Sequence, residues 1–337
     1  MQPLSWDYWR TTAILVILRH LKEAFDLATN GSPAFTVLIT NYNDAQFLPT
    51  ALEAILSQEP GPDQVIIADD GSTDDSVDVI EEWARQYDVI ELVRNPRNIG
   101  PIETANRILP QVRGDFFSWW SADDVIKPGL FAQAVAAAQQ FPHASVLATG
   151  TETVTETDRG HVETHDFGIS ENFVCYDANE FCRINRRRYV WLGSSGLFLR
   201  TQDVVAYHGW NPDFDWFADW ALSYSLALMH SVVLINTIGS RSVKRKGSFG
   251  AKARSNPERR SKAIRNFLAF LTERQNRSLK RRFRRALLIL PYAFGQRIFI
   301  ELLKNPGCWD ILAVCALGWL HHRFMNLMCK CKDFLSR

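Results

Sequence analysis

The chain has 337 residues, 46% of them hydrophobic and 22% charged, which excludes a disordered or fibrous protein and allows a sizeable buried core. The net charge of +1 combines two unlike parts, because residues 252–285 hold 13 Lys and Arg against two Glu while the remainder holds 25 basic and 35 acidic residues. Six cysteines without a CxxC pair indicate neither a zinc module nor a disulfide scaffold, and they fit a reducing cytoplasm.

Residues 1–32 predict an N-terminal amphipathic helix that ends at the helix-breaking sequence NGSPA. Beyond it, short apolar runs alternate with segments of helical spacing as far as residue 150. The runs predict strands at 35–40, 64–69, 90–93, 115–121 and 145–150. This alternation predicts an α/β fold with a mostly parallel central sheet that helices cover on both faces.

Polar residues follow three of these strands. Thr40–Asn43 follow the first, Asp69 and Asp70 the second, and Ser121–Asp124 the fourth. Ligands of open parallel sheets bind beyond the carboxyl ends of the strands, so the three loops are expected to share one rim. Adjacent carboxylates repel each other unless a cation, a donor group or a ligand lies between them. The sequence therefore predicts a binding site at this rim.

The second half of the chain has a different character. It predicts aromatic-rich mixed structure over 173–217, a helix over 217–229, a strand over 232–236, and basic helices from 251 to the end. His161 and His165 lie four residues apart, but the surrounding sequence DRGHVETHDFG lacks further metal ligands. It predicts a solvated loop.

The chain resembles the family 2 glycosyltransferases in four motifs, which are VLITNYNDAQFLPTALEAILSQ, QVIIADDGSTDDS, RNIGPIETANRIL and GDFFSWWSADDVIKPGLF. The resemblance implies the GT-A (nucleotide-diphospho-sugar transferase) fold over 33–250, with a nucleotide-binding half at 33–125 and an acceptor half at 126–250. Residues 251–337 would then form a basic helical extension, a candidate for membrane association.

The resemblance also implies roles for individual residues. The nucleotide-sugar would be bound by Thr40, Tyr42, Asn43, Asp70, Asn98 and Asp123, with the tyrosine stacking on the base and Asp70 accepting from a ring N–H. Asp123 and Asp124 would hold a divalent metal, Mn or Mg, against the donor diphosphate. Ser121 stands where the family usually has the first acid of its D-x-D motif, so the protein supplies fewer strong ligands.

The sequence FADW matches the place where the family supplies its catalytic base, which predicts Asp219 for that role and Asp215 as the alternate. The following KRKGSFG resembles the loop that closes over the donor, with Lys246 and Ser248 as its candidate contacts.

The resemblance implies an inverting, hexosyltransferase-type enzyme that moves a sugar from a nucleotide-diphosphate donor to a hydroxyl of a sugar, polysaccharide or lipid-linked acceptor. Together with the basic tail, it implies a role in bacterial polysaccharide or glycolipid biosynthesis. One alternative is a catalytically decayed nucleotide-sugar-binding or scaffold protein. Another is a sugar-phosphate nucleotidyltransferase, which needs a G-x-G-T-R loop where this chain has TNYNDAQ.

The basic run KRRFRR at 280–285 has two interpretations. It is either a solvated helix face or a face that lies on an anionic membrane with its apolar side in the interface. We favour the membrane interpretation, which predicts a cytoplasmic protein, peripheral on the inner face of the cell membrane. No nucleic-acid-binding motif is present in the sequence, so nucleic acid is not an expected partner.

Overall fold

The structure is a computed structural model that describes residues 31–295, 297–313 and 315–316. The amphipathic helix predicted for 1–32 falls almost wholly outside this part of the chain. Four cysteines lie within the described residues, and all four are free thiols, as a chain without a disulfide scaffold requires.

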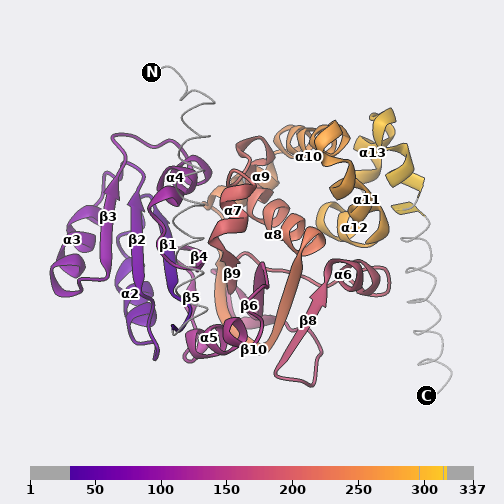
Figure 1. The fold of residues 1–337 in the computed structure, drawn as a ribbon. Helices are drawn as coiled ribbons and strands as arrows, with labels where there is room; N and C mark the ends of the chain where they lie inside the picture. The colour runs from indigo at the N-terminus through magenta and orange to yellow at the C-terminus, as the bar shows by residue number, and fades with distance from the viewer. Residues whose placement is uncertain (1–30, 296, 314, 317–337) are drawn as a thin grey trace, which may run out of the picture.

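A ten-stranded sheet runs through the described residues (Figure 1). Its strands are β1 (Phe35–Asn41), β2 (Gln64–Asp69), β3 (Ile90–Arg94), β4 (Phe116–Ser121), β5 (Val125–Ile126), β6 (Val146–Thr155), β7 (Asp158–His165), β8 (Phe173–Asp177), β9 (Leu197–Arg200) and β10 (Ser231–Lys244). Their order is β3-β2-β1-β4-β9-β6-β10-β5, while β7 pairs with β6 and β8 pairs with β10. The N-terminal strands β3, β2, β1 and β4 are parallel neighbours, and β6 is parallel to β10. The predicted α/β fold with a largely parallel sheet is therefore confirmed.

The longer helices are α2 (Leu48–Leu56), α3 (Ser76–Gln86), α4 (Pro101–Ile108), α5 (Leu130–Gln140), α6 (Ala178–Ile184), α7 (Thr201–Ala206), α8 (Ala218–Met229), α9 (Phe249–Ser255), α10 (Pro257–Thr272), α11 (Arg277–Arg285), α12 (Ile289–Phe294) and α13 (Arg297–Leu303). Short 3-10 turns stand at Leu109–Gln111, Pro212–Phe217, Arg274–Asn276 and Pro306–Cys308. Apolar side chains of α2, α3 and α5 pack on one face of the sheet. Those of α4, α7, α8 and the C-terminal helices pack on the other. Every residue of β2 is buried, as a strand covered on both faces requires.

The antiparallel strands are where the sequence analysis was incomplete or wrong. Residues 158–165, predicted to be a loop, form strand β7, which pairs along one side with β6. Val162 is the only apolar residue in this strand, so the alternation that marks a half-buried strand is missing from its sequence. The backbone ladder to β6 supplies the order that side-chain burial does not. Residues 173–177 and 197–200 also form strands, within a segment for which no strand was specified.

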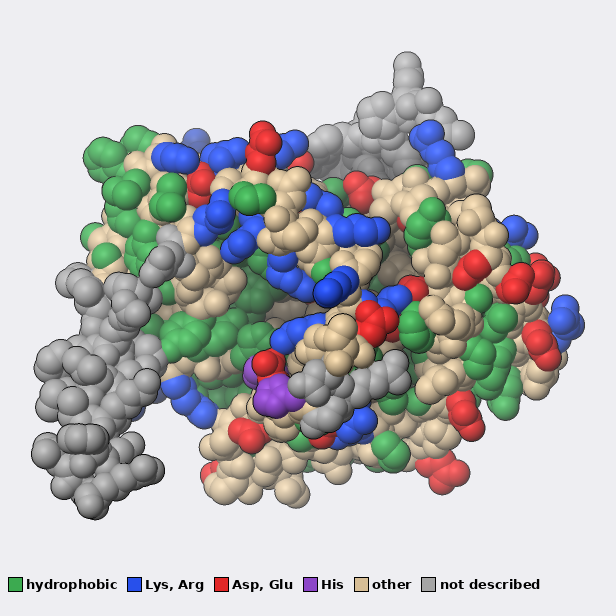
Figure 2. All heavy atoms as spheres, turned by 180° about the vertical axis from the view of Figure 1, so that it is seen from behind, with side chains coloured by type: hydrophobic (Ala, Val, Ile, Leu, Met, Phe, Trp, Pro, Cys, Tyr) green, Lys and Arg blue, Asp and Glu red, His purple; other side chains and the backbone are tan. Residues whose placement is uncertain are grey.

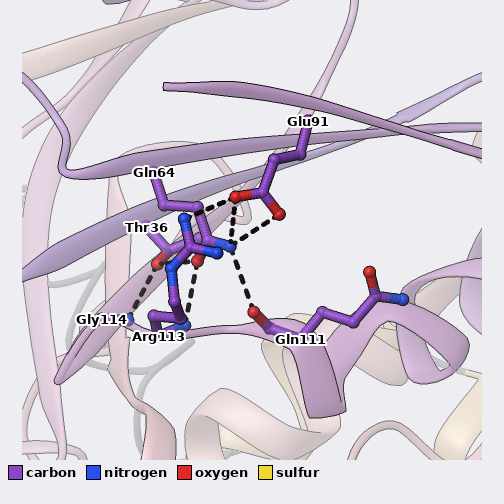
Figure 3. Close-up of polar contacts among 6 residues, drawn as sticks. All are labelled: Thr36, Gln64, Glu91, Gln111, Arg113 and Gly114. Atoms are coloured by element: carbon purple, nitrogen blue, oxygen red, sulfur yellow. Dashed lines mark hydrogen bonds and ion pairs between the residues drawn. The ribbon is translucent and has the colours of Figure 1, made fainter. Parts of the chain in front are cut away.

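The edge of the sheet where β1 and β2 begin is fixed by a polar network (Figure 3). The Gln64 side chain accepts from Thr36 Oγ1 at 3.0 Å and from the Arg113 amide at 2.9 Å. Its Nε2 donates to Glu91 and to the Gln111 carbonyl at 3.1 Å. The buried amide therefore has all its partners, and it fixes the register of three neighbouring strands. The network lies far from the rim where the polar loops gather.

The helices after residue 256 share the core of the sheet domain. Phe267 of α10 lies 5.8 Å from Phe217 and 5.9 Å from Trp220, measured between ring centroids. In α11, Leu279 and Phe283 are buried, so the apolar side that we expected in a membrane interface faces the protein instead. The division into domains at residue 250 stays a prediction. None of the helices within the described residues has the length and hydropathy that crossing a bilayer requires.

Candidate active site

The carboxyl ends of β1, β2 and β4 meet at one rim, as the sequence predicted. Asn41 stands opposite Asp69 in the ladder between β1 and β2, and Thr40 stands opposite Ser121 in the ladder between β1 and β4. The Trp119 indole donates to Thr40 Oγ1 at 3.1 Å. Three loops that are far apart in the sequence therefore line the same edge of the sheet.

Asp69 is an internal anchor of this rim. Its side chain is 1% exposed, and it accepts from Asn41 Nδ2 and from the Ser72 amide, both at 3.0 Å. These two bonds fasten the loop after β2 to the end of β1. The repulsion expected between Asp69 and its neighbour is offset by donors that serve each carboxylate separately.

Asp70 is also buried, with 2% of its surface exposed, and it organises the turn that leads into α4. It accepts from Asn95 Nδ2 at 2.8 Å, from the Ile99 amide at 2.9 Å and from the Gly100 amide at 2.8 Å. Gly100 has a φ of 96°, which only glycine adopts without strain. The carboxylate thus holds Asn98 and its neighbours against the rim. Any contact it makes to a nucleotide base has to use its remaining acceptor capacity.

Three predicted donor-binding residues differ in how accessible their side chains are to a ligand, namely Tyr42, Asn43 and Asn98. The Tyr42 ring is 45% exposed at the rim, which leaves it accessible for stacking. Asn43 has a φ of 54° and accepts from the Thr73 amide at 2.7 Å, so its side chain joins two rim loops. Asn98 Oδ1 accepts from the Gly100 amide at 3.1 Å. The tyrosine is therefore the rim residue best placed for an aromatic ligand.

Asp123 and Asp124 follow β4 and face different partners. Asp124 accepts from the Ser195 hydroxyl at 2.6 Å. Burial and the adjacent charge of Asp123 raise the pKa of Asp124 to about 7, against the lowering effect of the Ser195 hydrogen bond. Asp123 is paired with Arg245, whose Nε lies 2.5 Å from its Oδ2.

Asp123 and Asp124 suit a divalent cation if other ligands complete its coordination shell. Within the described residues there is no group of three or more His, Cys, Asp or Glu that could enclose a metal. Two carboxylates beside a serine match a hard cation that keeps phosphate and water oxygens in its coordination shell, which is the usual manner of Mg²⁺ at phosphate sites. The donor set therefore suits a cation that arrives with a diphosphate.

Asp219 lies in the first turn of α8, and its carboxylate accepts from the Trp220 amide at 2.7 Å. Burial raises the pKa of Asp219, while hydrogen bonds from the Trp220 amide and the Ser194 side chain act in the opposite direction. The positive charge of Arg254 also lowers the pKa of Asp219, by less than the hydrogen bonds do. A partly buried carboxylate that is hydrogen-bonded but not ion-paired can still accept a proton.

Asp215, the alternate base, is held in another way. Arg259 makes two bonds to it, from Nε at 2.5 Å and from Nη2 at 2.7 Å. Asp215 has a φ of 53°, an uncommon conformation for a residue other than glycine. The bidentate ion pair fastens this strained turn to α10, and it occupies both carboxylate oxygens.

Two adjacent serines connect the candidate metal acid with the candidate base. Ser195 donates to Asp124, and the side chain of Ser194 is hydrogen-bonded to Asp219. The next residue, Gly196, has a φ of 79°, and a Cβ there would lie 2.4 Å from Thr149 Oγ1. The sequence GSSG thus lets the chain turn tightly between the two acids. The sequence analysis did not identify these serines, and the paired glycines around them were the available signal.

The segment after β10 reaches back over the rim. Arg245 pairs with Asp123, and its Nη1 also lies 2.9 Å from Asp44 Oδ1. Ser248 caps α9 by accepting from the Ala251 amide at 3.2 Å, and Lys246 is exposed. Lys246 and Ser248 of this segment were predicted as contacts from the sequence, whereas Arg245 was not. Figure 2 shows Lys and Arg side chains gathered beside a hollow on the face opposite to the one seen in Figure 1.

The fold is of the GT-A type, and comparison with known proteins agrees. Residues 36–198 match the model of the family described as Glycosyl transferase family 2. Residues 36–198 are thus a family 2 glycosyltransferase domain, as the motifs predicted. Over 128 residues it is 27% identical to an uncharacterized glycosyltransferase of Haemophilus influenzae, covering 38% of this chain and 40% of that protein.

A longer alignment of 193 residues, 26% identical, matches the teichoic acid poly(glycerol phosphate) polymerase of Staphylococcus epidermidis, covering 55% of this chain and 25% of that protein. The chain therefore aligns with less than half the length of either relative. In three dimensions, it resembles the crystal structure of S. aureus TarS 1–349 in complex with UDP-GlcNAc, with a TM-score of 0.59 and 16% identity over 85% of this chain and 81% of that one. At this identity the likeness concerns the fold alone.

Proposed function

We propose that the chain transfers a sugar from a nucleotide-diphosphate donor to an acceptor hydroxyl with inversion at the anomeric carbon. The observation that carries this proposal is the partly buried carboxylate of Asp219, which is hydrogen-bonded but makes no ion pair within the described residues, and which is joined through Ser194 and Ser195 to Asp124 at the rim. A nucleotide-sugar binder without catalysis has no need for an acid in this environment. The nucleotidyltransferase alternative has no support from the loop after β1.

In the proposed reaction, Tyr42 stacks on the base and the rim loops hold the diphosphate end of the donor. Asp219 accepts the proton of the acceptor hydroxyl while that oxygen forms a bond to the anomeric carbon. The bond from this carbon to the diphosphate oxygen breaks on the opposite face, so the nucleoside diphosphate leaves with the bonding electron pair. The configuration at the carbon is inverted.

Asp123 and Asp124 are the residues that would hold a divalent cation, Mn²⁺ or Mg²⁺. When bound, such a cation supplies charge neutralisation for the donor and leaving diphosphate. The weak ligand at Ser121 favours a cation whose shell is completed by the donor, so we expect it to bind more tightly with donor than without.

We propose a bacterial cell-envelope polysaccharide or glycolipid as the acceptor class. The sequence similarity to a teichoic acid polymerase supports this class. The donor sugar and nucleotide belong to the broad class of nucleotide-diphospho-sugars.

The function is tested with a panel of nucleotide-diphospho-sugars and Mn²⁺ or Mg²⁺, read first by thermal shift and then by release of nucleoside diphosphate. We expect one donor to raise the melting temperature and to be consumed slowly in water and faster with acceptor. Chelation of the cation should stop the release. A donor that binds but is never consumed, with any acceptor of the class, would favour the binding protein instead.

We also propose an anionic membrane surface as a partner, with the protein at the inner face of the cell membrane. The support is α11, where Arg277, Arg281 and Arg285 repeat at intervals of four residues and are all exposed. Because the apolar residues of α11 face the core, this helix would be attracted to an anionic membrane by its charges alone. Exposed apolar side chains of the adjacent C-terminal segment, Ile300, Leu303 and Trp309, add an insertable surface.

This partner is tested by sedimentation with vesicles of phosphatidylcholine with and without phosphatidylserine. A Lys or Arg near an anionic surface contributes about 1 kcal/mol, so Arg281→Gln should weaken binding about fivefold and the triple substitution of the three arginines about a hundredfold. Arg85→Gln, on the exposed surface of α3, is the control and should bind as the parent does. Equal binding to neutral vesicles, or no effect of the triple substitution, would count against the proposal.

A further inference from the structure

Arg245 occupies the position of a cation between two acids of the rim. Its Nε lies 2.5 Å from Asp123 Oδ2, and its Nη1 and Nη2 lie 2.9 Å and 3.3 Å from the carboxylate oxygens of Asp44. The guanidinium stands 4.5 Å above the centre of the Phe47 ring. The Arg245 side chain is 19% exposed and that of Asp123 only 8%. The guanidinium is therefore held by two carboxylates and an aromatic ring, all of which stabilise a positive charge.

This position conflicts with the role proposed for Asp123. A divalent cation on Asp123 would lie within a few ångströms of the guanidinium that contacts Oδ2 of the same carboxylate at 2.5 Å, so the two positive charges would repel each other. Asp44 pairs with Arg245 as well and is not one of the two acids of the candidate metal pair. Either Arg245 or the cation can use Asp123.

Arg245 is also tied to the segment that follows it. Its carbonyl accepts from Ser248 Oγ at 3.0 Å, and the same Ser248 oxygen accepts from the Ala251 amide to begin α9. When Arg245 leaves the acids, the residues between β10 and α9 have to rearrange. The contact therefore links the state of Asp123 to the conformation of the loop above the rim.

We propose that Arg245 is a latch, which holds Asp123 and Asp44 in the donor-free protein and must leave Asp123 before a divalent cation can bind there. In this role Arg245 is a positioning residue, and Asp44 is its anchor. The inference rests on the proposed function for the identity of the cation, but its test uses protein without donor or acceptor.

The test is calorimetric titration of the full chain with Mn²⁺ alone. Replacing the latch in Arg245→Gln removes the competitor, and we expect Mn²⁺ to bind about tenfold more tightly, the change that corresponds to a charge-assisted hydrogen bond. Arg245→Lys keeps the positive charge but lacks the guanidinium that contacts both Asp123 and Asp44. Its affinity for Mn²⁺ should therefore lie between that of the parent and that of Arg245→Gln. Arg241→Gln on the same strand, which breaks a pair with Glu152 instead, should leave the affinity unchanged.

The variant Asp44→Asn distinguishes the latch proposal from a purely electrostatic effect on cation binding. Removing a negative charge near a cation site weakens cation binding if charge alone matters. If Asp44 anchors the latch, its loss frees Asp123 and Mn²⁺ binds more tightly. Tighter binding in both Arg245→Gln and Asp44→Asn is the expected result.

Weaker or unchanged binding in Asp44→Asn would overturn the proposal, and so would the absence of Mn²⁺ binding in every variant. Failure of the proposed function looks different. In that case the latch variants would bind Mn²⁺ more tightly, yet neither they nor the parent would consume any donor.

Discussion

Asp219→Asn should reduce sugar transfer by a factor on the order of 10² to 10⁴ while leaving donor and cation binding intact. Asparagine keeps the size of the side chain and can still accept from the Trp220 amide, but it cannot take the acceptor proton. The measurement is the rate of acceptor glycosylation at saturating donor, with donor affinity measured separately by calorimetry. Transfer within a few-fold of the parent would remove Asp219 from the role of base.

The pH dependence provides a second check on Asp219. A base acts in its ionised form, and burial raises the pKa of this carboxyl above that of an exposed aspartate, which is about 3.9. The acid limb of the kcat/KM profile should therefore lie above that ordinary value, with activity lost as the pH falls through it. An acid limb at or below about 3.9 would indicate that a different group acts as the base.

The same shift predicts the stability of the variant. Because the folded pKa is raised, the favourable contribution of Asp219 is complete below its unfolded pKa and is lost as the pH rises through the folded value. At neutral pH the ionised side chain is then a cost to the fold. Asp219→Asn should be at least as stable as the parent, so lost activity cannot be ascribed to unfolding.

Asp215→Asn is the matched comparison, because the residue lies four positions away and has an opposite environment. Its two oxygens are held by Arg259, so the substitution should lower stability by breaking a bidentate ion pair. Transfer should remain measurable in this variant. If Asp219→Asn proves active and Asp215→Asn inactive, the roles of the two acids are the reverse of those proposed.

The parallel half of the fold could be predicted from sequence because each of its strands is a short apolar run bounded by polar loops. β1 and β2 are buried on both faces, so burial leaves a plain pattern in the sequence. β7 is polar along its length and is held by backbone pairing, which side-chain periodicity does not report. β9 was missed for another reason, because its buried apolar run is only four residues long and lies within an aromatic-rich segment.

The candidate site also contains residues that could be predicted from the sequence and residues that could not. Residues such as Asp70 and Asp219 belong to local motifs and could be named in advance. Their partners could not, since Ser195 lies 71 residues from Asp124, Arg259 lies 44 from Asp215, and Arg245 lies 201 from Asp44. Only the folded sheet brings these groups together. The sequence thus indicated which acids matter, and the structure distinguishes an ion-paired acid from one whose carboxylate remains able to act.

Phe267→Ala should lower the free energy of unfolding by about 3 to 5 kcal/mol, the usual cost of removing a large aromatic side chain from a core. The ring is fully buried and lies 5.3 Å from Phe214, 5.4 Å from Phe283 and 6.4 Å from Phe294, between ring centroids. Its neighbours come from the segment before α8 and from two further C-terminal helices, α11 and α12. The cavity would therefore loosen the contact between the basic extension and the sheet domain.

Urea denaturation, followed both by circular dichroism and by tryptophan fluorescence, measures this loss. Ile300→Ala on α13 is the control, since its side chain is 52% exposed and its loss should change stability by about 0.5 kcal/mol or less. Because α10 and α8 share one core, both signals should shift together in a single transition. An early transition confined to the helical signal would mean that the C-terminal helices form a separate unit, with the boundary near residue 250 that the sequence predicted.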